Sequence, residues 1–246
     1  MKHNFGRFIS ILLALVMVAG FAASASAEEL GAGSETGVGE VEGGINTDVY
    51  EVVLPAVTDE IFDFIIDPYN LLNHTNGAAY EGKSFKENST LFFQRSDGMA
   101  EADYSDVSDP VTITNMSSKA INVSVDISID KSSLGGIVLT GDRDFTDDTR
   151  ASIYMALVDG EKEVPIGLDG ISVEATIGEA PEGAYEYRYD SESGEYTYGL
   201  TGNTSGIEFG TYSFQLTGAA NENGDWSGVM DAKPQIKVVW RIMPVK

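Results

Sequence analysis

The feature that most constrains the fold is a strict alternation in the stretch INVSVDISI, residues 121–129. Isoleucine or valine occupies every odd position of this stretch, and a polar residue occupies every even position. A period of two sustained over this length is typical of a β-strand that buries one face and leaves the other in water. A helix cannot place such a pattern on one face, because its side chains repeat every ~3.6 residues.

Further short runs rich in valine, isoleucine, threonine, tyrosine and phenylalanine follow one another along the chain, separated by turn residues. They cover residues 49–54, 61–66, 90–95, 111–116, 137–140, 152–158, 171–177, 185–189, 195–200, 210–217 and 236–242. No window shows a long helical period. Strands separated by turns, without helices between them, predict an all-β fold, an antiparallel β-sandwich or jelly-roll-like single domain.

Two of the connections have the composition of hairpin loops. We expect residues 115–120 to join the run 111–116 to the run 121–129 as a hairpin. We expect Ser193 and Gly194 to form the turn of a second hairpin, in which tyrosines of the two strands face one another.

The first residues predict export. Lys2 and Arg7 precede an apolar run at residues 8–23, and Ala25-Ser26-Ala27 supplies the small residues that a signal peptidase accepts. We therefore expect residues 1–27 to be a cleaved signal peptide. Residues 28–46 are rich in glycine and glutamate and predict a flexible leader, which leaves residues 47–246 for the β-sandwich domain. No later run approaches the ~18 apolar residues of a membrane span, so no span is expected after signal removal.

Composition narrows the location and the partners. The chain has no cysteine, which excludes disulfides, a thiol nucleophile and thiolate zinc sites. Export without disulfides favours a secreted, extracellular protein at the cell surface of a Gram-positive bacterium over an animal secretory protein. The net charge of −24 predicts no binding of nucleic acid, because like charges repel.

Catalytic chemistry has few candidates. His74 is the only histidine after the predicted signal, and the chain contains no G-x-S-x-G motif for a serine nucleophile. We predict that the protein is not an enzyme and needs no cofactor. A carboxylate-based glycoside hydrolase is the alternative, because that chemistry needs only two acids and the chain has 39. No pair of acids stands out in the sequence.

The stretch TGDRDFTDDTR, residues 140–150, concentrates acidic residues. Its aspartates are Asp142, Asp144, Asp147 and Asp148. Calcium takes about six to eight oxygen ligands, so the stretch is a candidate calcium site of an adhesion module. Arg143 lies inside it, however, and the glycine and glutamate of an EF-hand loop are missing. We favour an acidic loop before the next strand and assign no metal.

The final strand carries the first family resemblance. The A-x-A signal, the runs 62–68 and 111–129, and the ending VVWRI resemble exported β-sandwich proteins of Gram-positive bacteria. Trp240-Arg241-Ile242 is similar to the Trp-x-Leu signature of WxL surface domains, with isoleucine in place of leucine. Those domains typically carry two such motifs, and Trp226 has Gly228 at the matching place. The resemblance implies non-covalent binding to cell-wall material through Trp240 and Ile242. The alternative is that Trp240 is a core residue of an alternating strand.

Camelysin and TasA-type fibre proteins are a second comparison, because they share the signal, the absence of disulfides and the strand-rich composition. This resemblance implies subunits that add strands to one another. The best donor strand here contains Val49, Val52, Val53 and Leu54. We therefore expect a non-catalytic structural or binding protein whose partner is cell-wall material or a second copy of itself. The sequence leaves open a wall anchor, a fibre subunit and a free secreted protein.

Overall fold

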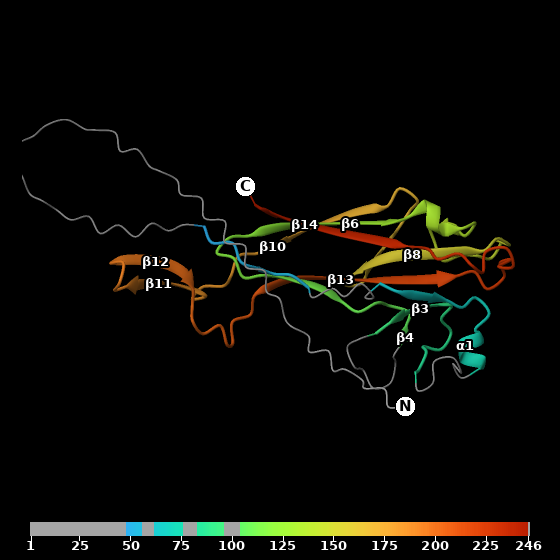
Figure 1. Ribbon diagram of the computed structural model, residues 1–246, viewed down its shortest axis with the longest axis horizontal. Coiled ribbons are helices and arrows are strands. Elements are labelled where there is room, and N and C mark those ends of the chain that lie inside the picture. Colours follow the sequence, from blue (N-terminus) through green and yellow to red (C-terminus); the bar gives the residue numbers. More distant parts are fainter. Residues whose placement is uncertain (1–47, 56–61, 76–82, 96–103, 246) are drawn as a thin grey trace, which may run out of the picture.

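The computed structural model describes residues 48–55, 62–75, 83–95 and 104–245, so the predicted signal peptide and leader lie outside the described residues. Almost all of the regular secondary structure in the described residues is β-strand, which confirms the predicted all-β fold class. Figure 1 shows β14, β6 and β10 in one long layer and β8 and β13 in a second layer that faces it. No helix in these ranges is long and apolar enough to cross a membrane.

The larger layer is a six-stranded sheet that is antiparallel except at one pair. Its members in spatial order are β1 (Val52–Val53), β5 (Val111–Asn115), β13 (Gly210–Ala220), β8 (Ser152–Asp159) and β7 (Val138–Thr140), with β9 (Lys162–Pro165) also paired to β8. The exception is β7, which runs parallel to β8. The first six residues of β8 are all buried, so both of its faces are covered.

The facing layer is a three-stranded sheet with β6 (Ile121–Ile129) between β10 (Ile171–Ile177) and β14 (Ile236–Pro244). The predicted alternation in β6 is confirmed, because every odd-numbered side chain is at most 4% exposed. These side chains form the centre of the hydrophobic core between the two sheets.

A third sheet adds to the core from beside β13. It consists of β2 (Phe64–Ile66), β3 (Leu91–Gln94) and β4 (Tyr104–Ser105). The short helix α1 (Leu71–His74) comes between β2 and β3 in the chain and lies beside this sheet in Figure 1. Leu91 of β3 is fully buried and reaches Gly218 of β13, where a Cβ atom would lie only 3.0 Å from the Leu91 side chain. Glycine at this position therefore lets β3 approach the larger sheet.

The predicted hairpin between β5 and β6 is wrong, because these strands belong to different sheets. The buried side chain of Asn115 explains the crossing: its amide nitrogen donates to the carbonyl oxygens of Lys119 and Gly178, and its oxygen accepts from the backbone of Ser117. Residues 115–118, the junction corner, thus turn the chain from one sheet into the other, with a bend at residues 117–119.

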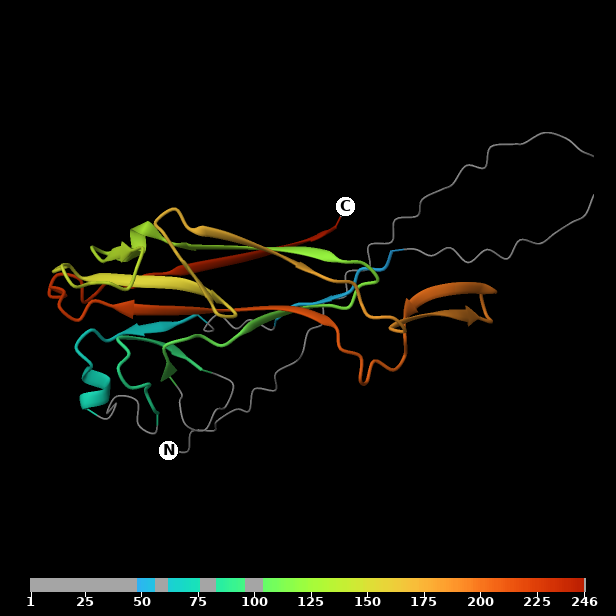
Figure 2. The ribbon, with the colours of Figure 1, turned by 180° about the vertical axis from the view of Figure 1, so that it is seen from behind.

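The second hairpin is confirmed. Strands β11 (Tyr185–Asp190) and β12 (Glu195–Leu200) pair only with each other. Figures 1 and 2 show this hairpin projecting beyond the end of the sandwich, near the junction corner. Gly194 has φ of 73°, a left-handed conformation that glycine adopts without strain, and it closes the turn.

Candidate functional site

The open edge of β14 is the first candidate site. β14 pairs with β6 on one side, and none of the described strands pairs with its other side. The carbonyl of Gln235 accepts from the amide of Asp130, and the amide of Val245 donates to the carbonyl of Ala120. Since orientation alternates along an antiparallel strand, the odd-numbered residues of β14 point their backbone groups at β6. The even-numbered residues point theirs at the open edge.

The backbone groups of Trp240 and Ile242 therefore point to the open edge, whereas their side chains pack toward the core. They lie opposite Val125 and Val123 of β6, and both side chains are partly buried against the core. Trp240 thus has a packing role, while its binding of cell-wall material stays a prediction. Trp226 differs, because it is only 3% exposed and its indole nitrogen donates to the carbonyl of Asn221 at 2.8 Å.

A groove adjoins the start of the same strand. It has a volume of about 780 Å³ and lies between β2 and the segment that leads into β14. Phe62, Phe64, Trp226, Val229 and Ile236 supply apolar side chains to its walls. β2 pairs with β3 on one side only within the described sheets. An apolar groove therefore lies beside the backbone edges of two strands.

The predicted donor strand forms the edge of the six-stranded sheet in its own chain. Val52 and Val53 pair with Asn115 and Thr114 of β5. Beyond this two-residue ladder, the amides of Val49 and Glu51 donate to serine hydroxyls of the junction corner, each at 2.9 Å.

The two faces of this strand differ. Val52 packs against the core, whereas Val53 is 46% and Leu54 40% exposed. The strand therefore packs the Val52 side chain against the core of its own chain, and two of its apolar side chains face solvent.

The aspartates of residues 140–150 come together in one loop, where they cap its turns. Asp142 accepts from the amide of Asp144, and Asp144 accepts from the amide of Thr146. Asp148 accepts from the guanidinium of Arg150 and the hydroxyl of Ser152, and these bonds hold the pKa of Asp148 well below its usual range.

Through these bonds, the carboxylates of Asp142, Asp144 and Asp148 stabilise the loop. Asp147 lines the same shallow depression as the other three aspartates. Among the residues that the structure describes, no three histidine, aspartate or glutamate side chains are arranged to hold a metal ion. Calcium binding by this loop stays a prediction.

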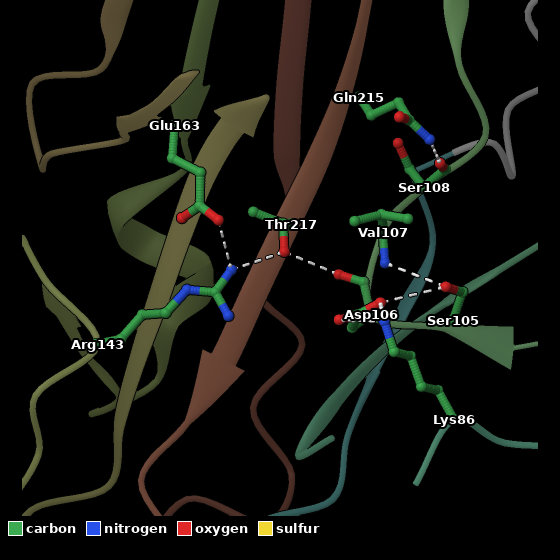
Figure 3. Close-up of polar contacts among 9 residues, drawn as sticks. All are labelled: Lys86, Ser105, Asp106, Val107, Ser108, Arg143, Glu163, Gln215 and Thr217. Atoms are coloured by element: carbon green, nitrogen blue, oxygen red, sulfur yellow. Dashed lines mark hydrogen bonds and ion pairs between the residues drawn. The ribbon is translucent and has the colours of Figure 1, made fainter. Parts of the chain in front are cut away.

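Arg143, inside the same loop, joins distant elements on the outer face of the six-stranded sheet (Figure 3). Its guanidinium forms an ion pair with Glu163 at 3.2 Å and donates to the hydroxyl of Thr217 at 2.8 Å. It also lies 5.1 Å from the ring centroid of Tyr154, whose hydroxyl donates to Glu163. Burial, followed by the bond to Glu163, raises the pKa of Tyr154.

The same network continues across β13. The Thr217 hydroxyl donates to the carbonyl of Asp106, and the Asp106 carboxylate forms an ion pair with Lys86 (Figure 3). These contacts connect the loop of residues 140–150 and residues 105–108 to strands β9 and β13 of the six-stranded sheet. The sequence did not predict this network, because Arg143 and Thr217 are 74 residues apart and no local pattern connects them.

The tyrosine hairpin is the remaining candidate. Cross-strand pairing brings Tyr187 next to Tyr198 and Tyr189 next to Tyr196, as the sequence predicted. The sequence did not predict that the hairpin projects from the sandwich with its rings half exposed. The exposure of these rings depends on whether other strands cover that face of the hairpin. The alternation of tyrosine with polar residues does not predict such a covering.

The chain matches no protein-family model, no curated protein and no solved structure. Its function is therefore inferred from the open sheet edges, the polar networks and the hairpin.

Proposed function

We propose that this chain is an exported, non-catalytic structural or binding protein of the Gram-positive cell surface, which associates with copies of itself or with cell-wall material through a sheet edge. The open edge of β14 carries the proposal. Ile236, Val238, Trp240 and Ile242 each direct an N–H and a C=O group away from β6. An unpaired edge of this length is a template for another extended chain.

The segment around β1 supplies a strand that fits such an edge. In its own sheet it is held by a ladder of two residue pairs, by two further backbone bonds to residues 116 and 118 and by serine hydroxyls, and two of its apolar side chains face solvent. A short edge strand has few backbone bonds to lose when it pairs instead with the open edge of β14 in a neighbouring copy. This supports self-association in which β1 of one copy pairs with a neighbouring copy.

The charged groups with shifted pKa values support a non-catalytic role. Hydrogen bonds to nearby serine or threonine residues lower the pKa of Asp126, Asp130, Asp144 and Asp225. Asp126 also forms an ion pair with Arg241, which joins β6 to β14. These carboxylates serve turns and strand pairing of the fold.

A matched pair of variants at Ile242 tests strand addition. Ile242→Pro removes an N–H that points at the open edge and leaves the hydrogen bonds to β6 in place. Ile242→Ala removes a similar amount of side chain and keeps that N–H. We expect protein starting at Glu28 to form assemblies, Ile242→Ala to retain them and Ile242→Pro to lose them, as measured by light scattering and electron microscopy.

Co-sedimentation with purified cell-wall fragments separates the two partners. Wild-type protein that stays monomeric but sediments with wall fragments would retain the wall-binding half of the proposal. If Ile242→Pro then sediments as well as Ile242→Ala, strand addition at β14 is wrong. Protein that is monomeric and indifferent to wall fragments contradicts the whole proposal.

A further inference from the structure

The β11–β12 hairpin carries five tyrosines on one face. Its register places Tyr187 opposite Tyr198 and Tyr189 opposite Tyr196, and Tyr185 follows on the same face nearer the sandwich. The ring centroids of the two cross-strand pairs are 4.8 Å and 5.0 Å apart. Three rings remain about half exposed: Tyr187 at 50%, Tyr189 at 58% and Tyr196 at 53%. The hairpin thus presents a row of rings to solvent, and we call it the tyrosine face.

The hairpin and the residues on either side of it carry a net negative charge. Residues 179–208 contain seven acidic side chains and a single basic one, Arg188. Arg188 lies on the opposite face of the hairpin. Its guanidinium forms an ion pair with Glu186 at 2.8 Å and donates to the carbonyl of Leu200. Glu192 lies in the turn, and Glu195, which is opposite Asp190, lies on the same face as Arg188. Within the described chain, neither carboxylate forms an ion pair. These carboxylates lie on the same two-stranded ribbon as the rings, and their charge acts at the tyrosine face over a distance of the order of the Debye length, about 8–10 Å, rather than by contact.

This combination selects a cationic ligand. The face of an aromatic ring attracts an arginine or lysine cation, and the carboxylates of the same hairpin add a longer-range attraction. Tyrosine also supplies rigid contact area at a low cost in conformational entropy. We propose that the tyrosine face docks an extended, arginine- or lysine-bearing segment of another protein.

Other occupants fit less well. Two hairpins of the same chain would bring like charges together, which disfavours a second copy. A neutral sugar polymer would use the rings but leave Glu192 and Glu195 without a role. The hairpin belongs to neither the β14 edge nor β1, so this docking site stands independently of strand addition.

Binding of a labelled peptide in which arginine and serine alternate tests the proposal on the full chain from Glu28. We expect binding that weakens as sodium chloride is raised, and no binding of the matched peptide with glutamate in place of arginine. The double variant Tyr189→Leu/Tyr196→Leu keeps apolar side chains but removes the rings, and should bind about tenfold more weakly. Tyr69→Leu removes a tyrosine elsewhere that is 49% exposed, and should leave binding unchanged.

The carboxylates give a second, less disruptive variant. Glu192→Gln/Glu195→Gln leaves every ring in place and should weaken binding several-fold at low salt, with the difference disappearing at high salt. Equal binding of the arginine and glutamate peptides overturns the proposal. So does binding of a neutral glucan oligosaccharide in place of the arginine peptide, or self-association that disappears in the tyrosine double variant.

Discussion

Strand β6 and the β11–β12 hairpin carry the same alternation of apolar and polar residues and have opposite environments. In β6 the odd-numbered side chains are at most 4% exposed, because the strand is central in its sheet and faces the six-stranded sheet. In the hairpin, three alternating tyrosines are at least 50% exposed. Alternation therefore predicts a strand and its apolar face, but it does not tell what covers that face.

The two regions also differ in what holds them. β6 has a strand on each side and a sheet against its apolar face, whereas a hairpin of two strands is only marginally stable in water. The β11–β12 hairpin is attached at its base to the junction corner. The hydroxyl of Tyr185 donates to the carbonyl of Met116 at 2.7 Å, and the amide of Ala180 donates to the carbonyl of Ser117 at 2.9 Å.

The largest effect should come from shortening a β6 side chain. Ile127→Ala removes a side chain that is 1% exposed and leaves a cavity, and it should lower the free energy of unfolding by about 2–5 kcal/mol. Tyr189→Ala, in the hairpin, should lower it by less than about 1 kcal/mol, because that ring is half exposed and contacts a single cross-strand partner. Chemical denaturation measures both. Similar losses for the two variants would contradict the difference between the regions.

The sequence predicted the β11–β12 hairpin and most of the strands, though not the short strands β4 and β9, because these features depend on local patterns. A loop of four residues ending in Gly194 is short enough that the two strands it connects pair with each other. It did not predict the sheet to which each strand belongs. The longer connection after β5 suits a hairpin as well as a crossing, and the crossing depends on bonds from Asn115 to residue 178, which is distant in the sequence.

The candidate sites also combine features that local sequence patterns predict with features that depend on the arrangement of the sheets. Trp240 and Ile242 were selected by a short motif, but only the sheet order shows that their strand is at an edge. The aspartates of residues 140–150 were ambiguous, because turn caps and calcium ligands use the same carboxylate oxygens. The tyrosine face needed one fact beyond the alternation and the acidic composition of residues 179–208: the hairpin projects from the sandwich.

A smaller effect should come from the junction corner, which connects the two regions. Asn115→Ala removes the bonds that its amide donates, including one to the buried carbonyl of Ile177, and leaves the buried amide of Ser117 without its partner, at a cost of about 2–3 kcal/mol. Hydrogen exchange should also become faster in the β11–β12 hairpin, since its base is attached to this corner. Ser118→Ala is the control, because it loses only partly buried bonds to Val49 and should cost about 1 kcal/mol or less. Equal costs would show that the corner is not organised by Asn115.

The smallest effects come from two tyrosine hydroxyls and should have opposite signs. Tyr185→Phe removes the bond to Met116 at the base of the hairpin and should destabilise the protein by about 1 kcal/mol. Tyr212, in β13, has a buried hydroxyl that finds no partner within the described chain. Tyr212→Phe removes an unsatisfied polar group and should therefore be neutral or stabilising by up to about 1 kcal/mol. Thermal unfolding of the two variants gives the signs directly.

The pH dependence of these two variants sharpens the comparison further. Burial raises the pKa of both Tyr185 and Tyr212 to about 12, and the negative charges of Glu51 and Asp159, respectively, add to the shift. A raised pKa means that the folded protein holds the phenol proton more tightly than the unfolded chain. The resulting stability is complete below about pH 10 and is lost as the pH rises towards 12. Each phenylalanine variant should lose less stability over this interval than the wild type, as measured by denaturation at several pH values. If Tyr185→Phe loses as much as the wild type while Tyr212→Phe does not, the hydroxyl of Tyr185 is already in water and the hairpin base is looser than its bond to Met116 indicates.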